Sequence, residues 1–536
     1  MKSLFLTPVG RDSNCTSSRS PSVNTIGFPT QGEVIQFIFD AFGVLPRKVT
    51  SDAEFNETRK KSTQTALQRL AEEKGALDPK FAEMVRVLSY LVAGDIPERV
   101  CLALGEILFD LFEIYRHTLR DEGTFLSKSG TAQWFLLGGA VTRLPISVAK
   151  HIHRYNLAAA VMVTPDDAYW YLPTMGPDGW IWPLEKTMRW AYQLAGTSGQ
   201  KFHWPDDPES SSKKQNLDSS KNWLAGRNLP SWPALLKNFN ESFDALDQCK
   251  DVRYQRTISN SQKESIRVAL FAARACTSIA ESVLGHFGNA VLQEFCSRYR
   301  IIADCVGDEV QSIRDCVQQV IAQRNLSPDE LDSVWFGVST DYWSEFSDKA
   351  SAVIRALSDG TITRTDANVM ALRFGRLAAL PIQQQQAFAP QHSVPSGFSD
   401  AVLDGLALRK SVDISTEKIE AYAVRLDSIG LRHLLPWMVP WQVATFFYRA
   451  ERYEDAYPFI KEAFQKAQYC AGSHQYMLLN QYIELSAKNN QWRDFNRGVE
   501  WATYLGFEVR MLRQQERTKE NLRSVFEFMQ KTVWAI

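Results

Sequence analysis

Residues 262–322 read QKESIRVALFAARACTSIAESVLGHFGNAVLQEFCSRYRIIADCVGDEVQSIRDCVQQVIA, and this is the strongest helical pattern in the chain. Its apolar residues recur at intervals of three and four, as they do on the buried side of an α-helix. Helical patterns continue beyond it, almost without a break, to residue 380. The sequence therefore predicts a mostly α-helical protein.

The N-terminal part is predicted to form a helical domain over residues 31–156. Within it, the stretch from Pro97 to Leu119 begins with a proline where the first turn of a helix tolerates one. Its apolar residues form one stripe at helical spacing: Val100, Leu104, Ile107, Leu108, Leu111 and Ile114. Residues 1–30 are predicted to be a flexible arm, because residues 10–30 are rich in Ser, Thr, Asn and Pro.

The period changes near residue 157, where we expect a β-hairpin. A short apolar run over 157–164 precedes the turn sequence Pro165-Asp166-Asp167, and an aromatic run over 168–172 follows it. Aromatic and β-branched residues on both sides of a Pro-Asp turn are typical of paired strands. The sequence 176–179 (GPDG) followed by Trp180-Ile181-Trp182 could add a third strand.

Turn-forming and biased segments divide the rest of the chain. Residues 157–250 are predicted to hold the hairpin and a helix-turn-helix-like element, and residues 251–382 a central helical domain. Residues 383–399 contain QQQQAFAPQHSVPSG and are predicted to be a linker. Residues 400–536 are predicted to be a C-terminal helical-repeat-like domain. The expected fold class is thus mostly α, multi-domain, with one small β-hairpin segment.

Composition and charge restrict the possible functions. The 536 residues include 60 Lys and Arg against 61 Asp and Glu. A protein that coats nucleic acid without specificity would carry a basic surplus, so any such contact must come from a local patch. The cysteines have no zinc or redox spacing and indicate buried thiols in a reducing compartment. Residues 1–20 do not resemble a secretory signal, and acidic residues interrupt the apolar stretch 85–115. We therefore expect a cytoplasmic protein without membrane contact.

Sequence motifs of catalysis are absent. The chain has no phosphate-binding loop, no G-x-G-x-x-G, no G-x-S-x-G and no H-E-x-x-H. We therefore expect no catalytic residue, no metal and no cofactor. One alternative is an enzyme with an unrecognised site near His151, His153 and Arg154, next to the hairpin. A simpler interpretation of these residues is a basic surface turn. On a helix the two histidines would point in different directions and would not share a metal, whereas on a strand they would share a face.

The most informative local pattern is residues 211–246, SSKKQNLDSSKNWLAGRNLPSWPALLKNFNESFDAL. It predicts a short helix from about Leu217 that ends at Gly226, and a second helix with Pro233 in its first turn. Trp223 fills the junction between them. The second helix carries an apolar stripe of Leu235, Leu236, Phe239 and Phe243.

This pattern resembles the second half of a helix-turn-helix of the Cro and phage-repressor family. The matching residues are Trp223, Gly226, Pro230, Ser231 and Leu235. The resemblance implies a recognition helix over Asn216–Leu224 that binds double-stranded DNA. The implied base-edge or phosphate contacts within this helix are Asn216, Ser219, Ser220 and Asn222, and the implied phosphate-binding cations are Lys213, Lys214, Lys221 and Arg227.

The chain departs from that family in one respect. The preceding family helix should lie in residues 183–196, but the insert between it and Asn216 is longer than the family's. An ordinary amphipathic helix pair is therefore the alternative. A second, fainter helix-turn-helix pattern lies at residues 361–380, where Thr363 or Thr365 as a helix N-cap explains the same residues.

The C-terminal region has the character of a repeat. Residues 441–466 begin with W-x-x-A-x-x-F-Y-x-x-x-R-Y-x-x-A, and N-N-Q-W-x-x-F-x-x-x-V-x-x-A follows within residues 476–505. The pairs Arg452-Tyr453 and Gln491-Trp492 stand 39 residues apart. The pattern is similar to tetratricopeptide repeats, which implies a protein partner bound through residues 436–510. An ordinary bundle of helical hairpins is the alternative.

Three hypotheses follow. The first is a non-enzymatic, DNA-associated helical protein, such as a prokaryotic regulator or a component of antiviral defence or of a mobile element. The second is a helical scaffold that binds only protein partners. The third is an enzyme with an unrecognised active site.

Overall fold

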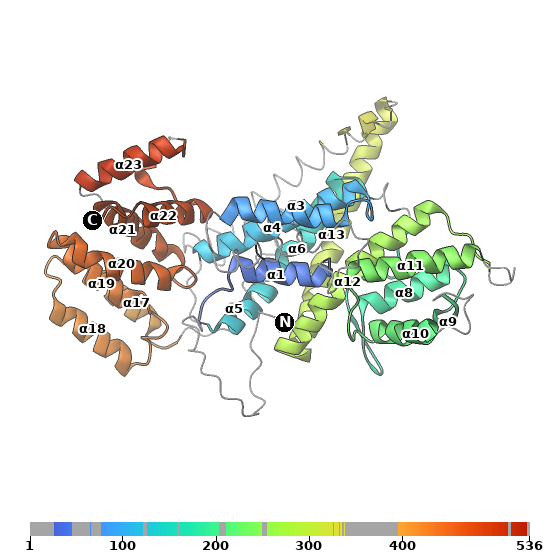
Figure 1. Ribbon diagram of the computed structural model, residues 1–536, viewed down its shortest axis with the longest axis horizontal. Coiled ribbons are helices and arrows are strands. Elements are labelled where there is room, and N and C mark those ends of the chain that lie inside the picture. Colours follow the sequence, from blue (N-terminus) through green and yellow to red (C-terminus); the bar gives the residue numbers. More distant parts are fainter. Residues whose placement is uncertain are drawn as a thin grey trace.

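The computed structural model is 74% helical, so the predicted fold class is confirmed (Figure 1). The predicted pattern at 361–380 and most of the predicted linker at 383–399 lie outside the residues that the structure describes. The structure describes residues 26–44, 65, 77–121, 126–157, 161, 163–202, 211–248, 255–324, 326–327, 329–331, 333–334, 337, 395–512 and 516–532.

The helices of the N-terminal part begin with a well-defined cap. The Thr30 hydroxyl accepts a hydrogen bond from the Glu33 backbone amide, and the Glu33 carboxylate accepts one from the Thr30 amide, which satisfies two amides that the helix leaves free. The helix ends at Gly43, whose φ is 64°. The elements of this part are α1 (Gln31–Phe42), α3 (Leu77–Val92), α4 (Glu98–Asp121), α5 (Lys128–Trp134), the π-helix η1 (Phe135–Ala140) and α6 (Val141–Arg154).

The middle of the chain contains the predicted long helical stretch. Residues 262–322 form most of two helices, which separate at Gly288 because its φ of 83° interrupts the helical backbone. Ser259 caps the first of them with a capping box that includes Gln262. The elements are α8 (Pro183–Leu194), α9 (Gly199–Phe202), α10 (Ser211–Leu224), α11 (Trp232–Asp247), α12 (Asn260–Phe287) and α13 (Asn289–Arg324).

A two-stranded antiparallel hairpin lies in the predicted region, but its strands are not all the expected ones. β1 (Thr174–Gly176) pairs with β2 (Gly179–Ile181), with Met175 opposite Trp180. The expected third strand is therefore real. The strand expected over 168–172 is wrong, because residues 168–171 form turns in which the Tyr169 amide donates to Asp167 Oδ1. Residues 161 and 163–165 also have no strand structure.

Helix α12 connects the N-terminal and middle parts of the chain. It packs against α1, α8, α11 and α13, and in Figure 1 it lies between the blue N-terminal helices and the green helices α8–α11. Helix α13 in turn packs against α6. The segments predicted as separate domains over 31–156, 157–250 and 251–382 thus share contacts along α12 and α13.

Arg274, near the middle of α12, is bound at the point where these parts meet. Arg274 is only 6% exposed. Its guanidinium donates to the Pro230 carbonyl over 2.9 Å and to the Asp40 carbonyl over 2.8 Å. The Ala41 carbonyl is a third acceptor. Since Asp40 and Ala41 end α1 and Pro230 precedes α11, one side chain fixes both elements to α12.

Helix α12 is also, among the described residues, the one helix that is long and apolar enough to cross a membrane. Half of its most apolar 18-residue window is buried inside the protein. The core helix of a globular protein passes the same test of length and composition. Helix α12 packs against four other helices, as a core helix does.

The C-terminal part is a stack of helical hairpins that lies on the left of Figure 1. The first hairpin is α17–α18, the second is α19–α20 and the third is α21–α22, and α23 packs on α21 at the far end. The elements are α17 (Phe398–Lys410), α18 (Thr416–Ser428), α19 (Met438–Arg449), α20 (Tyr453–Ala467), the 3-10 turn η3 (Gly472–His474), α21 (Gln475–Lys488), α22 (Trp492–Tyr504), the 3-10 turn η4 (Arg510–Leu512) and α23 (Lys519–Lys531).

This stack shares its core with the N-terminal part. The Phe28 amide donates to the Tyr469 carbonyl over 2.9 Å, and the Gln475 side chain donates to the Leu119 carbonyl over 3.4 Å. Phe28 is 2% exposed, and the Tyr115 hydroxyl donates to the Pro29 carbonyl. Residues 26–30 of the predicted arm are therefore packed in the structure, whereas residues 1–25 lie outside the described part.

We predict that Arg274→Met destabilises the fold strongly. The substitution keeps much of the side-chain volume but leaves three buried carbonyls without their donor, which should lower the free energy of unfolding by about 3 kcal/mol. Urea denaturation followed by circular dichroism measures this change. Lys237→Met is the control, since the Lys237 side chain is 74% exposed and should shift stability by less than about 0.5 kcal/mol. Equal stability of the two variants would refute the role of Arg274.

Candidate functional site

The first candidate site is the predicted DNA-binding element around α10 and α11. Gly226 follows α10 with a φ of 70°, and α11 has Pro233 in its first turn. Both predicted helix boundaries are confirmed, although α10 begins at Ser211, earlier than expected. In the predicted apolar stripe of α11, Leu235, Phe239 and Phe243 are at most 2% exposed and Leu236 is half-buried against the core.

The eight residues implied by the resemblance do not share one exposed surface. Lys221, Asn222 and Arg227 are exposed, and Ser219 is half-buried. Ser220 is 3% exposed and its hydroxyl is hydrogen-bonded to Tyr192 of α8, so it does not face a ligand. The remaining three lie on the backbone of α10, but their side chains are outside the described part: Lys213, Lys214 and Asn216.

Electrostatics weaken the positive charge of this element. Lys221 lies 3.6 Å from Asp218 on the same helix, with 75% and 59% of the two side chains exposed. Such an exposed pair contributes little to stability, but it offsets the charge that a phosphate would meet. Arg227 and Lys221 are thus the two described cations of the predicted set, and one of them is partly neutralised.

The turn between α10 and α11 is fixed to the core. The Trp232 amide donates to the Gly43 carbonyl over 2.8 Å, and its indole donates to Asp95 over 3.1 Å. A Cβ atom on Gly226 would lie 2.7 Å from both Glu281 Oε1 and Trp182 Nε1. Glycine is therefore required here both by the positive φ and by the close approach of these side chains.

Burial raises the pKa of Glu281 to about 7, and the charge of Arg274 opposes this shift. The carboxyl group lies under the turn, beside Gly226, as the close approach to that residue indicates. A group with this pKa is protonated at slightly acid pH and charged at slightly basic pH. The stability of this region is therefore linked to pH.

The histidines near residue 150 are buried, so the expected basic surface turn is wrong. His151 and His153 are 0% and 2% exposed and lie on α6, which continues to Arg154 and is packed against both α4 and α13. His151 Nε2 lies 2.8 Å from Asp110 Oδ2. Ser147 also donates to that carboxylate, over 2.8 Å.

This arrangement is suited to holding α4 and α6 together. Burial acts to raise the pKa of Asp110, but the hydrogen bond from His151 and the charge of Lys150 bring it below its ordinary value. In a nucleophilic site the serine hydroxyl donates to the imidazole, which the acid orients. Here Ser147 donates to Asp110 and not to the His151 imidazole, so the three residues are not arranged in that order. A fully buried imidazole is also out of reach of a substrate. Among the described residues, no three His, Cys, Asp or Glu side chains are placed to hold a metal ion.

The second candidate site is the C-terminal stack, in which two turns have matching geometry. Glu451 and Asn490 both have positive φ, 56° and 55°. The following amides make matching hydrogen bonds, from Arg452 to the Phe447 carbonyl and from Gln491 to the Ser486 carbonyl. The two hairpins thus turn in the same way 39 residues apart, as the sequence indicated.

Buried polar contacts hold the second and third hairpins in register. The Trp441 indole donates to Gln481 over 2.8 Å, and the Tyr448 hydroxyl donates to Glu484 over 2.6 Å. All four residues are at most 2% exposed. The predicted small residue Ala456 is fully buried, which allows close approach of the helices. The stack is therefore a rigid support for whatever lies on its surface.

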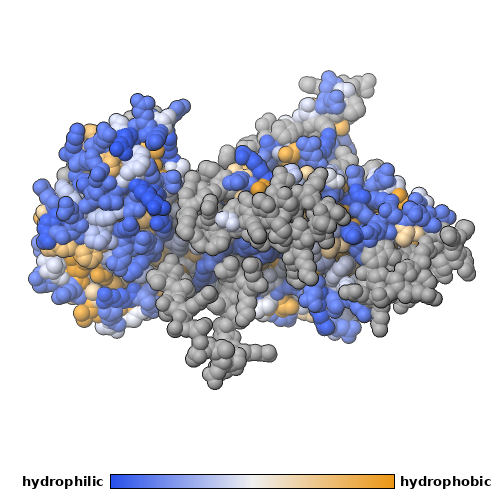
Figure 2. Space-filling model, viewed as in Figure 1, coloured by the Kyte–Doolittle hydropathy of each residue, from blue (hydrophilic) through white to orange (hydrophobic). Residues whose placement is uncertain are grey.

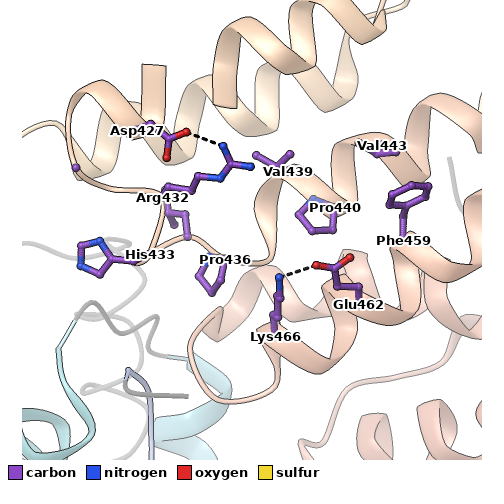
Figure 3. A pocket seen from close by; sticks show the side chains of 12 residues that line it. Asp427, Arg432, His433, Pro436, Val439, Pro440, Val443, Phe459, Glu462 and Lys466 are labelled. Carbon is purple, nitrogen blue, oxygen red and sulfur yellow. Dashed lines mark hydrogen bonds and ion pairs between the residues drawn. The ribbon is translucent and has the colours of Figure 1, made fainter. Parts of the chain in front are cut away.

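A pocket of about 620 Å³ opens on this support, between the loop after α18 and the helices α19 and α20 (Figure 3). Val439, Pro440 and Val443 present an apolar stripe from α19, and Phe459 faces it from α20. All four are half-buried. The lining is completed by Asp427, Gly430, Arg432, His433, Leu435, Pro436, Glu462 and Lys466.

The charged residues of the pocket are paired with each other. Arg432 lies 2.7 Å from Asp427, and Lys466 lies 2.6 Å from Glu462. Figure 3 shows these two pairs on opposite sides of the apolar stripe. The pocket thus offers an apolar centre with no net charge from its ion pairs.

The segment predicted to bind a protein partner, residues 436–510, includes part of the pocket lining, but no sequence pattern singled out the pocket residues. The signal was present in α19, which has apolar residues on two sides. Trp441, Ala444 and Tyr448 form its buried side, at most 2% exposed. Val439 and Val443 form a second stripe, and a helix that is apolar on both sides is expected to bury both.

If α10 and its turn bind DNA, we predict that Lys221→Glu with Arg227→Glu weakens binding by at least about 10-fold. Loss of two phosphate contacts should also lower the salt-dependence slope by about 2. Fluorescence anisotropy with a duplex of about 20 base pairs, over a salt series, measures both. Both side chains are exposed, so folding should be unaffected; Lys237→Glu is the matched control. Wild-type protein without salt-sensitive affinity would contradict DNA binding here.

We also predict that stability falls as pH rises from about 5 to about 8, in part through Glu281. The folded state holds this proton up to a pKa of about 7, whereas the unfolded chain releases it near 4.5, so charging the buried carboxyl destabilises the fold. Glu281→Gln should remove this contribution and gain stability at pH 8 relative to wild type. Thermal denaturation across this range is the measurement. An unchanged pH profile in the variant would exclude Glu281 as the cause.

Comparison with known proteins identifies no relative. No family model matches the chain, and neither a curated protein nor a solved structure matches it.

Proposed function

We propose that this protein is a helical scaffold that binds a partner protein through its C-terminal stack. The observation that carries this proposal is the apolar pocket on α19 and α20. An exposed apolar pocket with a charged rim is typical of a protein-recognition surface. The function is binding, with no chemistry assigned to it.

The pocket favours a partner of a particular kind. Its stripe, Val439, Pro440 and Val443, follows α19 over about one turn. A partner helix with apolar side chains at spacings of three or four could lie along such a stripe, as in other helix-in-groove complexes. Because the pairs Asp427–Arg432 and Glu462–Lys466 balance each other, the inserted side chains would be apolar.

The rigidity of the stack supports this function. The α19 residues beneath the pocket, including Trp441 and Ala444, are fully buried. A site built on packed helices is already formed before binding, so little conformational entropy is lost when the partner arrives.

DNA association through α10 is the second candidate function. The observation in its favour is the exposure of Lys221, Asn222 and Arg227 near the end of α10. The burial of Ser220 and the pairing of Lys221 with Asp218 count against it. In that case the protein would be a DNA-associated regulator or a defence or mobile-element component.

The scaffold proposal is tested with helical peptides selected by phage display on the full chain. Val443→Asp places a charge in the apolar centre and should weaken the selected peptide by at least about 10-fold, since a buried aliphatic side chain contributes about 1.5–3 kcal/mol. Fluorescence anisotropy of the labelled peptide measures the dissociation constant.

The control is Val412→Asp, because Val412 is 95% exposed in the turn between α17 and α18, outside the pocket. Circular dichroism and thermal denaturation of both variants check that they fold, because Val443 is half-buried and Val412 is exposed. Peptides that bind Val443→Asp as tightly as wild type would overturn the proposal for this pocket.

A further inference from the structure

The two ends of the C-terminal stack are closed in different ways. At the far end, α23 buries Val525, Phe526 and Met529. Its outer side carries the exposed pair Arg523–Glu527. At the near end, among the described residues, the outer side of the first hairpin, α17–α18, carries exposed apolar residues between its charged ones. Stacked-hairpin proteins need a polar cap at each end to remain soluble as single chains.

The outer side of the first hairpin has an apolar centre. Leu403 on α17 and Val424 on α18 are 64% and 67% exposed. Ala407 and Ala421 are also exposed. We call these four residues the open face; Figure 2 shows hydrophobic residues gathered over α17–α19 on the view drawn.

The open face points away from the rest of the stack. On α17, a Cβ atom at Gly405 would lie 2.8 Å from the Met438 side chain, so that side of the helix faces α19. Leu403 is two residues away, about 200° around the helix. On α18 the buried residues are Ile419, Tyr422, Ala423 and Leu426, and Val424 lies outside this set.

We propose that the open face binds the open face of a second copy of this chain, forming a two-fold dimer. Head-to-tail stacking would place the open face on α23, whose outer side is largely charged. Pairing of like faces buries both apolar centres and closes the assembly at two copies.

The charges on the hairpin match a two-fold pairing. In an antiparallel pair of α17 helices centred on Gly405, Leu403 lies over Ala407 of the second copy and Asp400 lies beside its Lys410. In an antiparallel pair of α18 helices, Val424 lies over Ala421 of the second copy and Arg425 beside its Glu420. In both helix pairs a large apolar side chain of one copy thus lies against an alanine of the other, and an acidic side chain lies beside a basic one. These charged residues are all exposed: Asp400, Lys410, Glu420 and Arg425.

One axis can serve both helix pairs. The ion pair between Asp404 and Arg425 fixes the relative height of α17 and α18 within one copy. It brings the centres of the two apolar pairs to within about two residues, or roughly 3 Å, of each other along the helices. A single two-fold axis perpendicular to the helices therefore satisfies both pairings.

The size of the face predicts a weak dimer. Two helices of 13 residues are each about 20 Å long. Side by side they bury on the order of 1,000 Å² in total, at the lower limit of specific interfaces. Association in the micromolar range, with a clear dependence on concentration, is what such an area supports.

Sedimentation equilibrium of the full chain, up to about 300 µM, tests the proposal. The weight-average mass of wild type should rise with concentration toward twice that of one chain. Leu403→Glu with Val424→Glu should stay at the mass of one chain. Phe528→Glu is the matched control, because Phe528 is 45% exposed on α23 and should dimerise like wild type.

A charge exchange tests the register. Lys410→Glu should raise the dissociation constant by about 10-fold through repulsion with Asp400 of the second copy, and adding Asp400→Lys should restore it. A wild type that remains a single chain at all concentrations overturns the dimer and leaves the face for a different protein. A mass above that of two chains also overturns the dimer. So does a Phe528→Glu variant that fails to dimerise to the same extent as Leu403→Glu with Val424→Glu. Failure of the charge exchange alone overturns the antiparallel register.

Discussion

The buried guanidinium of Arg274 is the interaction on which the arrangement of the first two-thirds of the structure depends. A charge inside a protein is tolerated when hydrogen bonds replace its water, and here three backbone carbonyls do so. Those carbonyls end one helix and precede another, so the same contact that solvates the charge also places α1 and α11 on α12. Gly43 leaves space for it, since a Cβ atom there would meet the guanidinium.

This constraint bears directly on the two candidate functions. The turn before α11 is held by Arg274 and Trp232, so α10 projects from a fixed base and not from a separate small domain. The pocket on α19 and α20 lies in a stack with its own polar register, from Trp441 and Tyr448. Different residues therefore hold the two regions in place, although both regions belong to one hydrophobic core.

Local patterns were predictable from the sequence because local physics determines them. The helical stretch 262–322, Gly226 at a helix end and the matching turns near 452 and 491 depend only on neighbouring residues. The position of the hairpin, the burial of His151 and Ser220, and the pocket beside Val443 depend on which helix sides meet. Periodicity identifies an apolar side but not its partner, so these features could not be read from one sequence.

The contact between Phe28 and Tyr469 has a consequence for biosynthesis. A ribosome makes residue 28 long before residue 469, yet the Phe28 amide donates to the Tyr469 carbonyl in the finished fold. Contacts between such distant residues form late and slowly. While most of the protein is translated, the nascent chain therefore lacks the Tyr469 side of this contact, and Phe28 has only earlier partners such as Tyr115. The apolar surface around Phe28 is a natural substrate for chaperones that shield exposed apolar segments.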